Sequence, residues 1–140
     1  MRLWHYKLIP LLPNKMLVSQ WRECIAIKRQ WEKGTLKHRL VSYVMDYDKS
    51  YFSNYIVKVA NEMDKRNIKF KENLLDELLE FSSNIYSIFD LDYPEHNDRY
   101  LNQCIFNLQE KFDRKIITED EWLKIRKLFN EIKLDKNLTD

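Results

Sequence analysis

Glycine and proline are scarce in this sequence, with one and three residues respectively among 140. That usage is too low for a disordered chain or for a turn-rich β protein. No apolar run approaches the roughly 18 residues needed to cross a bilayer, and the opening residues are too few and too polar for a signal peptide. We therefore expect a soluble, cytoplasmic, all-α protein that makes no contact with a membrane.

The common catalytic signatures are also missing. One glycine cannot build a phosphate-binding loop, and no H-E-x-x-H, C-x-x-C or G-x-S-x-G string occurs. Cys24 and Cys104 lack metal-ligand spacing and lie in helical apolar patterns, so we interpret both as buried structural thiols. His5, His38 and His96 lie on separate elements without ligand spacing. We expect no metal and no cofactor, and amine and carboxylate chemistry is what remains.

The net charge of +2 conceals two regions of opposite sign. Residues 1–39 carry nine basic and two acidic side chains, a balance of +7, whereas residues 40–140 carry 15 basic and 20 acidic ones, a balance of −5. A protein that presents one basic end suits a polyanionic partner such as nucleic acid. A helix with a solvated basic face would give the same balance, so charge alone does not decide between the two.

Apolar residues spaced three and four apart predict a single compact helical bundle over residues 1–140. Gly34 and Asn67 are predicted to end two of the helices, and Thr118 with Glu121 has the form of a capping box. Residues 1–12, here called the arm, have no helical period and are predicted to be extended, packed near the first long helix. The predicted helices are 14–33, a short stretch at 35–45, 48–66, 71–89, 98–115 and 118–134.

The first long helix carries an apolar stripe that should pack inward. Its members have three-four spacing: Leu17, Trp21, Cys24, Lys28 and Trp31. Glu23 belongs to the neighbouring strip of the same helix, together with Gln20. We therefore expect the Glu23 carboxylate near the edge of the buried face.

Several motifs resemble one known family, the pyrimidine-dimer DNA glycosylases that include phage endonuclease V. The strongest are M-R-L-W-H at 1–5, L-I-P at 8–10 with Pro13, and Q-W-R-E-C at 20–24. Weaker similarity continues through 37–38, 47–49, 59–66, 93–96 and 108–111, so the resemblance covers about residues 1–112. It implies an all-α domain that acts on damaged double-stranded DNA, excises a base and nicks the resulting abasic site.

The resemblance implies that the N-terminal α-amine of Met1 is the nucleophile and that Glu23 is the catalytic carboxylate. An α-amine has a pKa of about 7.7–8.0 against about 10.4 for a lysine, so far more of it is the free base at neutral pH. Methionine followed by Arg2 is a poor substrate for methionine removal, and we expect Met1 to be the mature terminus. Such an amine forms an imine with the opened deoxyribose, and β-elimination then breaks the strand.

The resemblance also suggests residues that bind the substrate. A phosphate role suits the basic ones, whereas the two histidines could contact DNA or hydrogen-bond to the backbone. The candidates are Arg2, His5, Arg22, Lys37, His38 and Lys111.

The chain departs from the family at its C-terminal end, where an amphipathic helix from Thr118 replaces an aromatic tail implicated in dimer recognition. Met16 and Asn107 stand where the phage enzyme has a histidine and a basic residue. These differences affect the expected specificity for the lesion more than the expected chemistry of the N-terminal amine. An abasic-site lyase, a glycosylase for another lesion, and a non-catalytic helical DNA-binding or partner-binding module remain alternatives. We expect a monomer.

Overall fold

The computed structural model describes residues 1–82 and 91–139. Within these ranges the chain is helical without a strand, which confirms the all-α prediction. No helix in the described ranges combines the length and the apolar character needed to cross a membrane. The elements in order are η1 (Tyr6–Leu11), α1 (Asn14–Glu32), η2 (Ser42–Asp46), α2 (Lys49–Lys65), α3 (Glu72–Phe81), α4 (Asp98–Asp113) and α5 (Glu119–Thr139).

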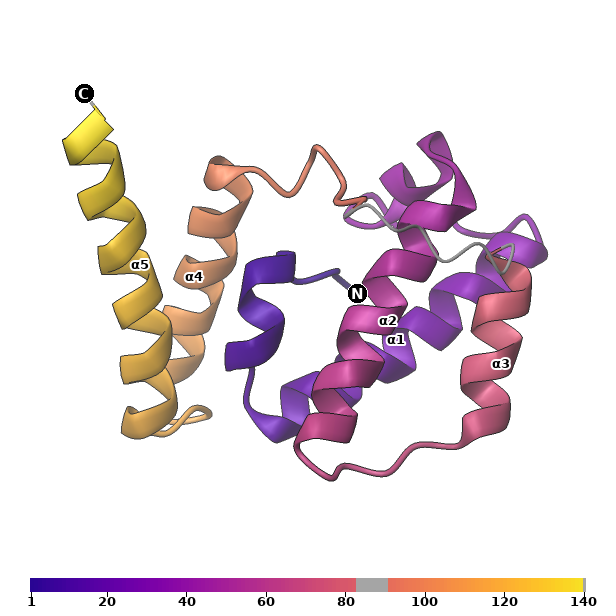
Figure 1. The fold of residues 1–140 in the computed structure, drawn as a ribbon, viewed down its shortest axis with the longest axis horizontal. Helices are drawn as coiled ribbons and strands as arrows, with labels where there is room; N and C mark the ends of the chain where they lie inside the picture. The colour runs from indigo at the N-terminus through magenta and orange to yellow at the C-terminus, as the bar shows by residue number, and fades with distance from the viewer. Residues whose placement is uncertain (83–90, 140) are drawn as a thin grey trace.

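The arm lies between two groups of helices (Figure 1). Helices α4 and α5 pack together on one side, and α1, α2 and α3 pack on the other. Buried apolar side chains from the arm, among them Leu3, Leu8 and Leu12, belong to the same core as those of the helices. The N-terminus consequently reaches the middle of the molecule, beside α1 and α2.

The prediction of an extended arm holds for residues 1–5, whereas Tyr6–Leu11 form the 3-10 helix η1. His5 caps this helix, because its Nδ1 accepts the Lys7 N–H at 3.1 Å. Pro10 is accommodated because its fixed φ lies within the 3-10 range. A six-residue helix with three residues per turn leaves no trace of the 3.6-residue period, which explains the missed assignment.

Helix α1 has the predicted extent and the predicted inner face. Leu17, Trp21, Cys24 and Lys28 are buried, and Trp31 is half-buried. Lys28 is tolerated there because its ammonium pairs with Glu32 of the same helix and with Glu77 of α3. Gly34 follows the helix with φ of +70°, the left-handed conformation that a glycine adopts at no steric cost.

The short helix predicted at 35–45 is wrong for residues 35–41, which form a loop before η2. Only Leu36, Val41 and Val44 are buried in this stretch, so the core holds it at separate points instead of along a continuous helical face. Packing along such a face is what stabilises a short helix in water. Ser42 and Tyr43 are half-buried, and the remaining positions, among them Lys37, His38 and Leu40, are exposed.

The starts of the other helices agree with the predictions to within one residue, whereas α5 ends at Thr139, five residues beyond the predicted end at 134. Asp48 caps α2 by accepting the Ser50 N–H at 2.9 Å, and Asn67 ends that helix region with φ of 57°. The predicted helix 71–89 is observed as α3 up to Phe81, and its part from 83 to 89 lies outside the described residues.

The predicted capping box at the start of α5 is confirmed. Thr118 N–H donates to Glu121 Oε1 at 2.9 Å, and Glu121 N–H donates to Thr118 Oγ1 at 3.2 Å. This reciprocal pair fixes where α5 begins, next to the end of the arm.

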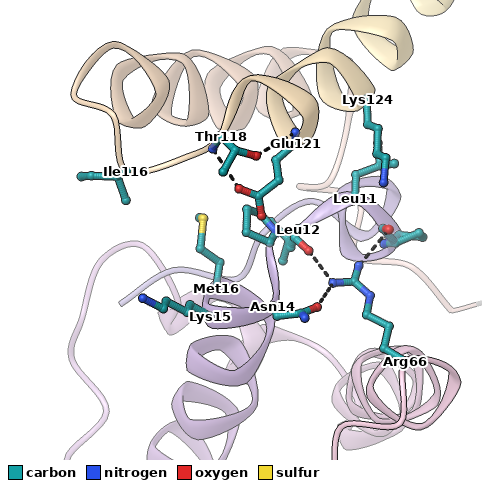
Figure 2. A pocket seen from close by; sticks show the side chains of 12 residues that line it. Leu11, Leu12, Asn14, Lys15, Met16, Arg66, Ile116, Thr118, Glu121 and Lys124 are labelled. Carbon is teal, nitrogen blue, oxygen red and sulfur yellow. Dashed lines mark hydrogen bonds between the residues drawn. The ribbon is translucent and has the colours of Figure 1, made fainter.

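Arg66 holds the far end of the arm against α2 (Figure 2). Its guanidinium donates to the carbonyls of Leu12 at 2.6 Å and Pro10 at 2.9 Å, and to Asn14 Oδ1 at 3.0 Å. An open groove of about 670 Å³ lies here, between the end of the arm and the start of α5. Neither Met1 nor Glu23 lines this groove, so it is separate from the predicted catalytic pair.

Candidate active site

Gln20 joins α1 to the extended part of the arm. Its side chain is fully buried, and its Nε2 donates to the Arg2 carbonyl at 2.9 Å and to Glu23 Oε2 at 3.2 Å. Its Oε1 accepts the Trp4 N–H at 2.7 Å and lies 2.9 Å from the Tyr55 hydroxyl. A glutamine amide has two donor and two acceptor positions, and all four are occupied.

Two tyrosines hold the arm from other helices. The Tyr55 hydroxyl of α2 lies 2.6 Å from the Trp4 carbonyl, so it shares its proton between this oxygen and Gln20. The Tyr100 hydroxyl of α4 donates to the Leu3 carbonyl. The main chain of residues 2–4 is therefore fixed from α1, α2 and α4 at once.

Glu23 is half-buried beside this part of the arm, at the edge of the α1 face as predicted. Its Oε2 accepts the Arg2 N–H at 3.4 Å and the Gln20 amide at 3.2 Å. Its Oε1 accepts no hydrogen bond from any described residue. The α-amine of Met1 is separated from the Arg2 nitrogen by three bonds, which is roughly 3 Å in space. The chain's α-amine therefore lies within roughly 6 Å of Glu23 Oε2, and no ion pair joins these two groups in the described residues.

Arg2 lies in the same place and is half-buried. The guanidinium carbon stands 5.6 Å from the Trp4 ring centroid and 6.0 Å from that of Tyr100, within cation–π range. Nη1 lies 4.0 Å from Cys104 Sγ. No carboxylate of the described residues pairs with this cation, so its charge is available to an anion at the site.

The other basic candidates are more dispersed. Arg22 is exposed on α1, one residue before Glu23, and lines an open groove with Lys15 and Ile68. Lys37 and His38 are exposed in the loop after α1, where His38 Nδ1 accepts the Leu40 N–H. Lys111 is half-buried in the last turn of α4. Within the described residues no contact joins Lys37, His38 or Lys111 to Glu23 or Met1.

His5 is placed differently from the other candidates, because only 1% of it is exposed. Its ring stacks on Tyr6 at 4.6 Å and accepts the Lys7 N–H, which is the backbone alternative considered from the sequence. Burial lowers the pKa of His5 to about 4, so the ring is neutral at physiological pH. In this conformation the ring does not face solvent.

His96 continues the same buried cluster. Its Nδ1 accepts the Tyr6 N–H at 3.3 Å, and its Nε2 lies 2.7 Å from the Tyr43 hydroxyl. Because Nδ1 is an acceptor, the neutral tautomer carries its proton on Nε2. Burial lowers the pKa of His96 to about 3. Both histidines thus position the arm as neutral rings.

The two cysteines are buried and unpaired, as predicted. Burial raises the pKa of both the Cys24 and the Cys104 thiol, so neither is a nucleophilic thiolate at neutral pH. Across residues 1–82 and 91–139, no group of three His, Cys, Asp or Glu side chains has the geometry to hold a metal ion.

The sequence interpretation did not single out Gln20, Tyr55 or Tyr100 as site residues. One signal was available for Gln20, since a spacing of three residues puts it on the same helix face as Glu23. No comparable signal exists for the tyrosines, because their partners in the arm lie 51 and 97 residues away.

Comparison with known proteins gives one match. The family model described as pyrimidine dimer DNA glycosylase matches residues 1–76, which is more than half of the chain. This span includes the arm, Gln20, Glu23 and Tyr55. No curated protein matches the chain, and no solved structure matches it.

Proposed function

Because this chain belongs to the pyrimidine dimer DNA glycosylase family, we propose that it excises a damaged base from DNA with its N-terminal amine and then cleaves the strand at the abasic site. The family implies DNA as the substrate. One observation supports the proposed mechanism: the hydrogen bond from the Arg2 N–H to Glu23 Oε2, which holds the neighbouring α-amine within roughly 6 Å of a carboxylate.

The first step replaces the base by the enzyme's amine. The lone pair of the Met1 nitrogen attacks C1′ of the target nucleotide, and the C1′–N bond breaks as the base leaves with its electron pair and takes up a proton. The amine loses a proton, and the C1′–O4′ bond then breaks as O4′ takes up a proton, so that the nitrogen lone pair forms an iminium between the Met1 nitrogen and C1′. The negative charge of Glu23 stabilises the positive charge that develops on the sugar.

The second step breaks the strand. A base removes a proton from C2′, the electron pair forms the C2′–C3′ double bond, and the C3′–O bond breaks to release the phosphate. Water then hydrolyses the imine and returns the free amine. We assign the removal of the C2′ proton to Glu23 Oε1, because this oxygen accepts no hydrogen bond from the described residues and is free to accept the proton.

Substrate binding in this proposal depends on the basic region of residues 1–39 and on Lys111 of α4. Arg2 contacts the phosphate nearest the amine, and Arg22, Lys37, His38 and Lys111 contact phosphates further along the duplex. His5 acts indirectly in this scheme, because its buried ring caps η1 and thereby positions the arm.

Borohydride trapping tests the proposal. Reduction of the imine on duplex DNA with one abasic site should join protein and DNA covalently. The matched control is the same protein with an N-terminal extension, which hides the amine and should abolish trapping while DNA binding persists. Equal trapping by the extended protein would assign the imine to a lysine. Binding without trapping or cleavage by the native terminus would instead leave a non-catalytic DNA-binding module.

A second measurement identifies the lesion. Single duplexes carrying a pyrimidine dimer, an oxidised base, an alkylated base or an abasic site should separate glycosylase activity from lyase activity. We expect strand cleavage of the dimer-containing and the abasic duplexes. Cleavage of the abasic duplex alone would restrict the activity to the second step.

A further inference from the structure

We propose that Gln20 is the positioning residue of this site, and that its side-chain amide sets both the place of the α-amine and the orientation of the Glu23 carboxylate. The inference rests on the proposed function. It concerns a residue that contacts neither base nor sugar in that mechanism and acts through the two groups that do.

The amide is suited to this task because its two ends have opposite hydrogen-bonding character. The arm presents an acceptor at the Arg2 carbonyl and a donor at the Trp4 N–H, and Gln20 meets the first with Nε2 and the second with Oε1. Only one orientation of the amide satisfies both contacts. The extended arm is therefore held in a single register against α1.

The same amide orients the catalytic carboxylate. Nε2 makes its second hydrogen bond to Glu23 Oε2, which also accepts the Arg2 N–H. Two donors on one oxygen turn the carboxylate so that Oε1 is left for the substrate. A side chain without donors at position 20 would lose the contact with the Arg2 carbonyl and the contact with Glu23 together.

Burial makes the arrangement stiff. Gln20 is 0% exposed, so water cannot replace a lost partner without opening the contact between the arm and α1. A small displacement of the amine matters, since a misplacement of about 1 Å lowers a rate by on the order of 100-fold.

Two substitutions separate positioning from folding. Gln20→Glu keeps the shape and both acceptor contacts, but it donates to neither the Arg2 carbonyl nor Glu23 when ionised and to only one of them when protonated. Gln20→Met removes all four contacts and keeps a similar length. In single-turnover trapping on abasic DNA, we expect both variants to form the imine about 100-fold more slowly, with a Kd for DNA within about twofold of the parent value.

The pH profile provides a readout that loss of stability alone would not move. In Gln20→Glu a second carboxylate adjoins Glu23, and like charges at that distance disfavour double ionisation. We therefore expect the acidic limb of the cleavage profile to move to higher pH in this variant and to stay in place in Gln20→Met. Ile125→Val, a buried change in α5, is the stability control and should trap at the parent rate.

The outcomes separate the two proposals. A parent protein that fails to trap overturns the proposed function. A parent that traps, together with Gln20 variants that trap equally fast, overturns the role of Gln20 and leaves the function standing. Should both variants fail to fold, Tyr55→Phe decides, because it removes one contact to Gln20 Oε1. Imine formation slowed about tenfold supports the proposal, and an unchanged rate overturns it.

Discussion

His5 and His96 lie together in the interior with ring centroids 5.4 Å apart, and each accepts a backbone N–H from the arm. Their pKa values, about 4 and about 3, lie below the usual 6.5 because burial disfavours the charged ring. The unfolded chain therefore binds more protons than the folded protein at mildly acidic pH. The contribution of the two neutral histidines to the free energy of unfolding is fully present above pH 6.5. It is lost as the pH falls from 6.5 to about 3.

We accordingly expect the free energy of unfolding to decrease between pH 6.5 and pH 4.5, by up to about 1.4 kcal/mol per pH unit for each histidine. Urea denaturation at pH 7.0, 6.0 and 5.0 measures this. His96→Gln keeps an acceptor and a donor without the titration, so its curve should be flatter. Equal slopes for both proteins would show that His96 does not contribute.

The role of the Glu23 carboxylate can be tested by a single substitution. Glu23→Gln keeps the size of the side chain but removes the charge and the C2′ base. We expect it to retain some imine trapping while strand cleavage falls by about 100-fold or more. Denaturing electrophoresis of a labelled abasic strand, run beside trapped samples, gives both quantities. Glu80→Gln, an exposed change on α3, is the control, and full cleavage by Glu23→Gln would remove this carboxylate from the mechanism.

Among the helices, the start of α5 offers a direct test of local structure. Thr118→Ala removes one half of the capping box and leaves the Glu121 N–H without its partner. We expect the free energy of unfolding to fall by about 1 kcal/mol in thermal or urea denaturation. Lys127→Ala, exposed further along α5, should change it by less than about 0.5 kcal/mol. Equal effects of the two substitutions would contradict a role for the cap.

The predictability of the elements depends on whether their stabilising groups are local. Helices α1 and α2 were predicted well, because their apolar periods, the Asp48 cap and the terminating Gly34 and Asn67 all act within a few residues. The loop at 35–41 and the 3-10 helix η1 were not. The loop is held by burial of single residues, which gives no periodic apolar pattern in the sequence. Helix η1 has a period of three residues, which a search for the 3.6-residue period of an α-helix does not detect.

The candidate site was only partly predictable, because some of its residues are determined by local spacing and others by contacts between distant segments. Helical spacing put Glu23 at the edge of the buried face, and the family resemblance supplied the pairing with the Met1 amine. The residues that bring the two together were outside reach, because Gln20 contacts a backbone group 16 residues away and Tyr100 one that is 97 residues away. Such contacts arise only when distant segments pack.

For the whole molecule, the proposed phosphate contacts predict how DNA binding depends on salt. The logarithm of the binding constant should fall linearly with the logarithm of the salt concentration, and each lost contact should reduce the slope by about 0.9. We expect this reduction for Arg22→Ala and for Lys111→Ala, measured by fluorescence anisotropy on an undamaged duplex. Asp113→Ala, exposed at the end of α4, should leave the slope unchanged. Parent slopes in both basic variants would exclude these two contacts.

Among the described residues, five hydrogen bonds hold residues 2–4 by main-chain atoms of the arm and do not depend on the side chains of these residues. Side chains of α1, α2 and α4 therefore position the terminus, and they lie far from the arm in the sequence. Substitutions at residues 2–4 that keep the buried apolar side chains of Leu3 and Trp4 should therefore leave the course of the arm unchanged. In the proposed function, a substitution at residues 2–12 leaves the main-chain amine in place, whereas an acetyl group on that amine would block imine formation in a single modification.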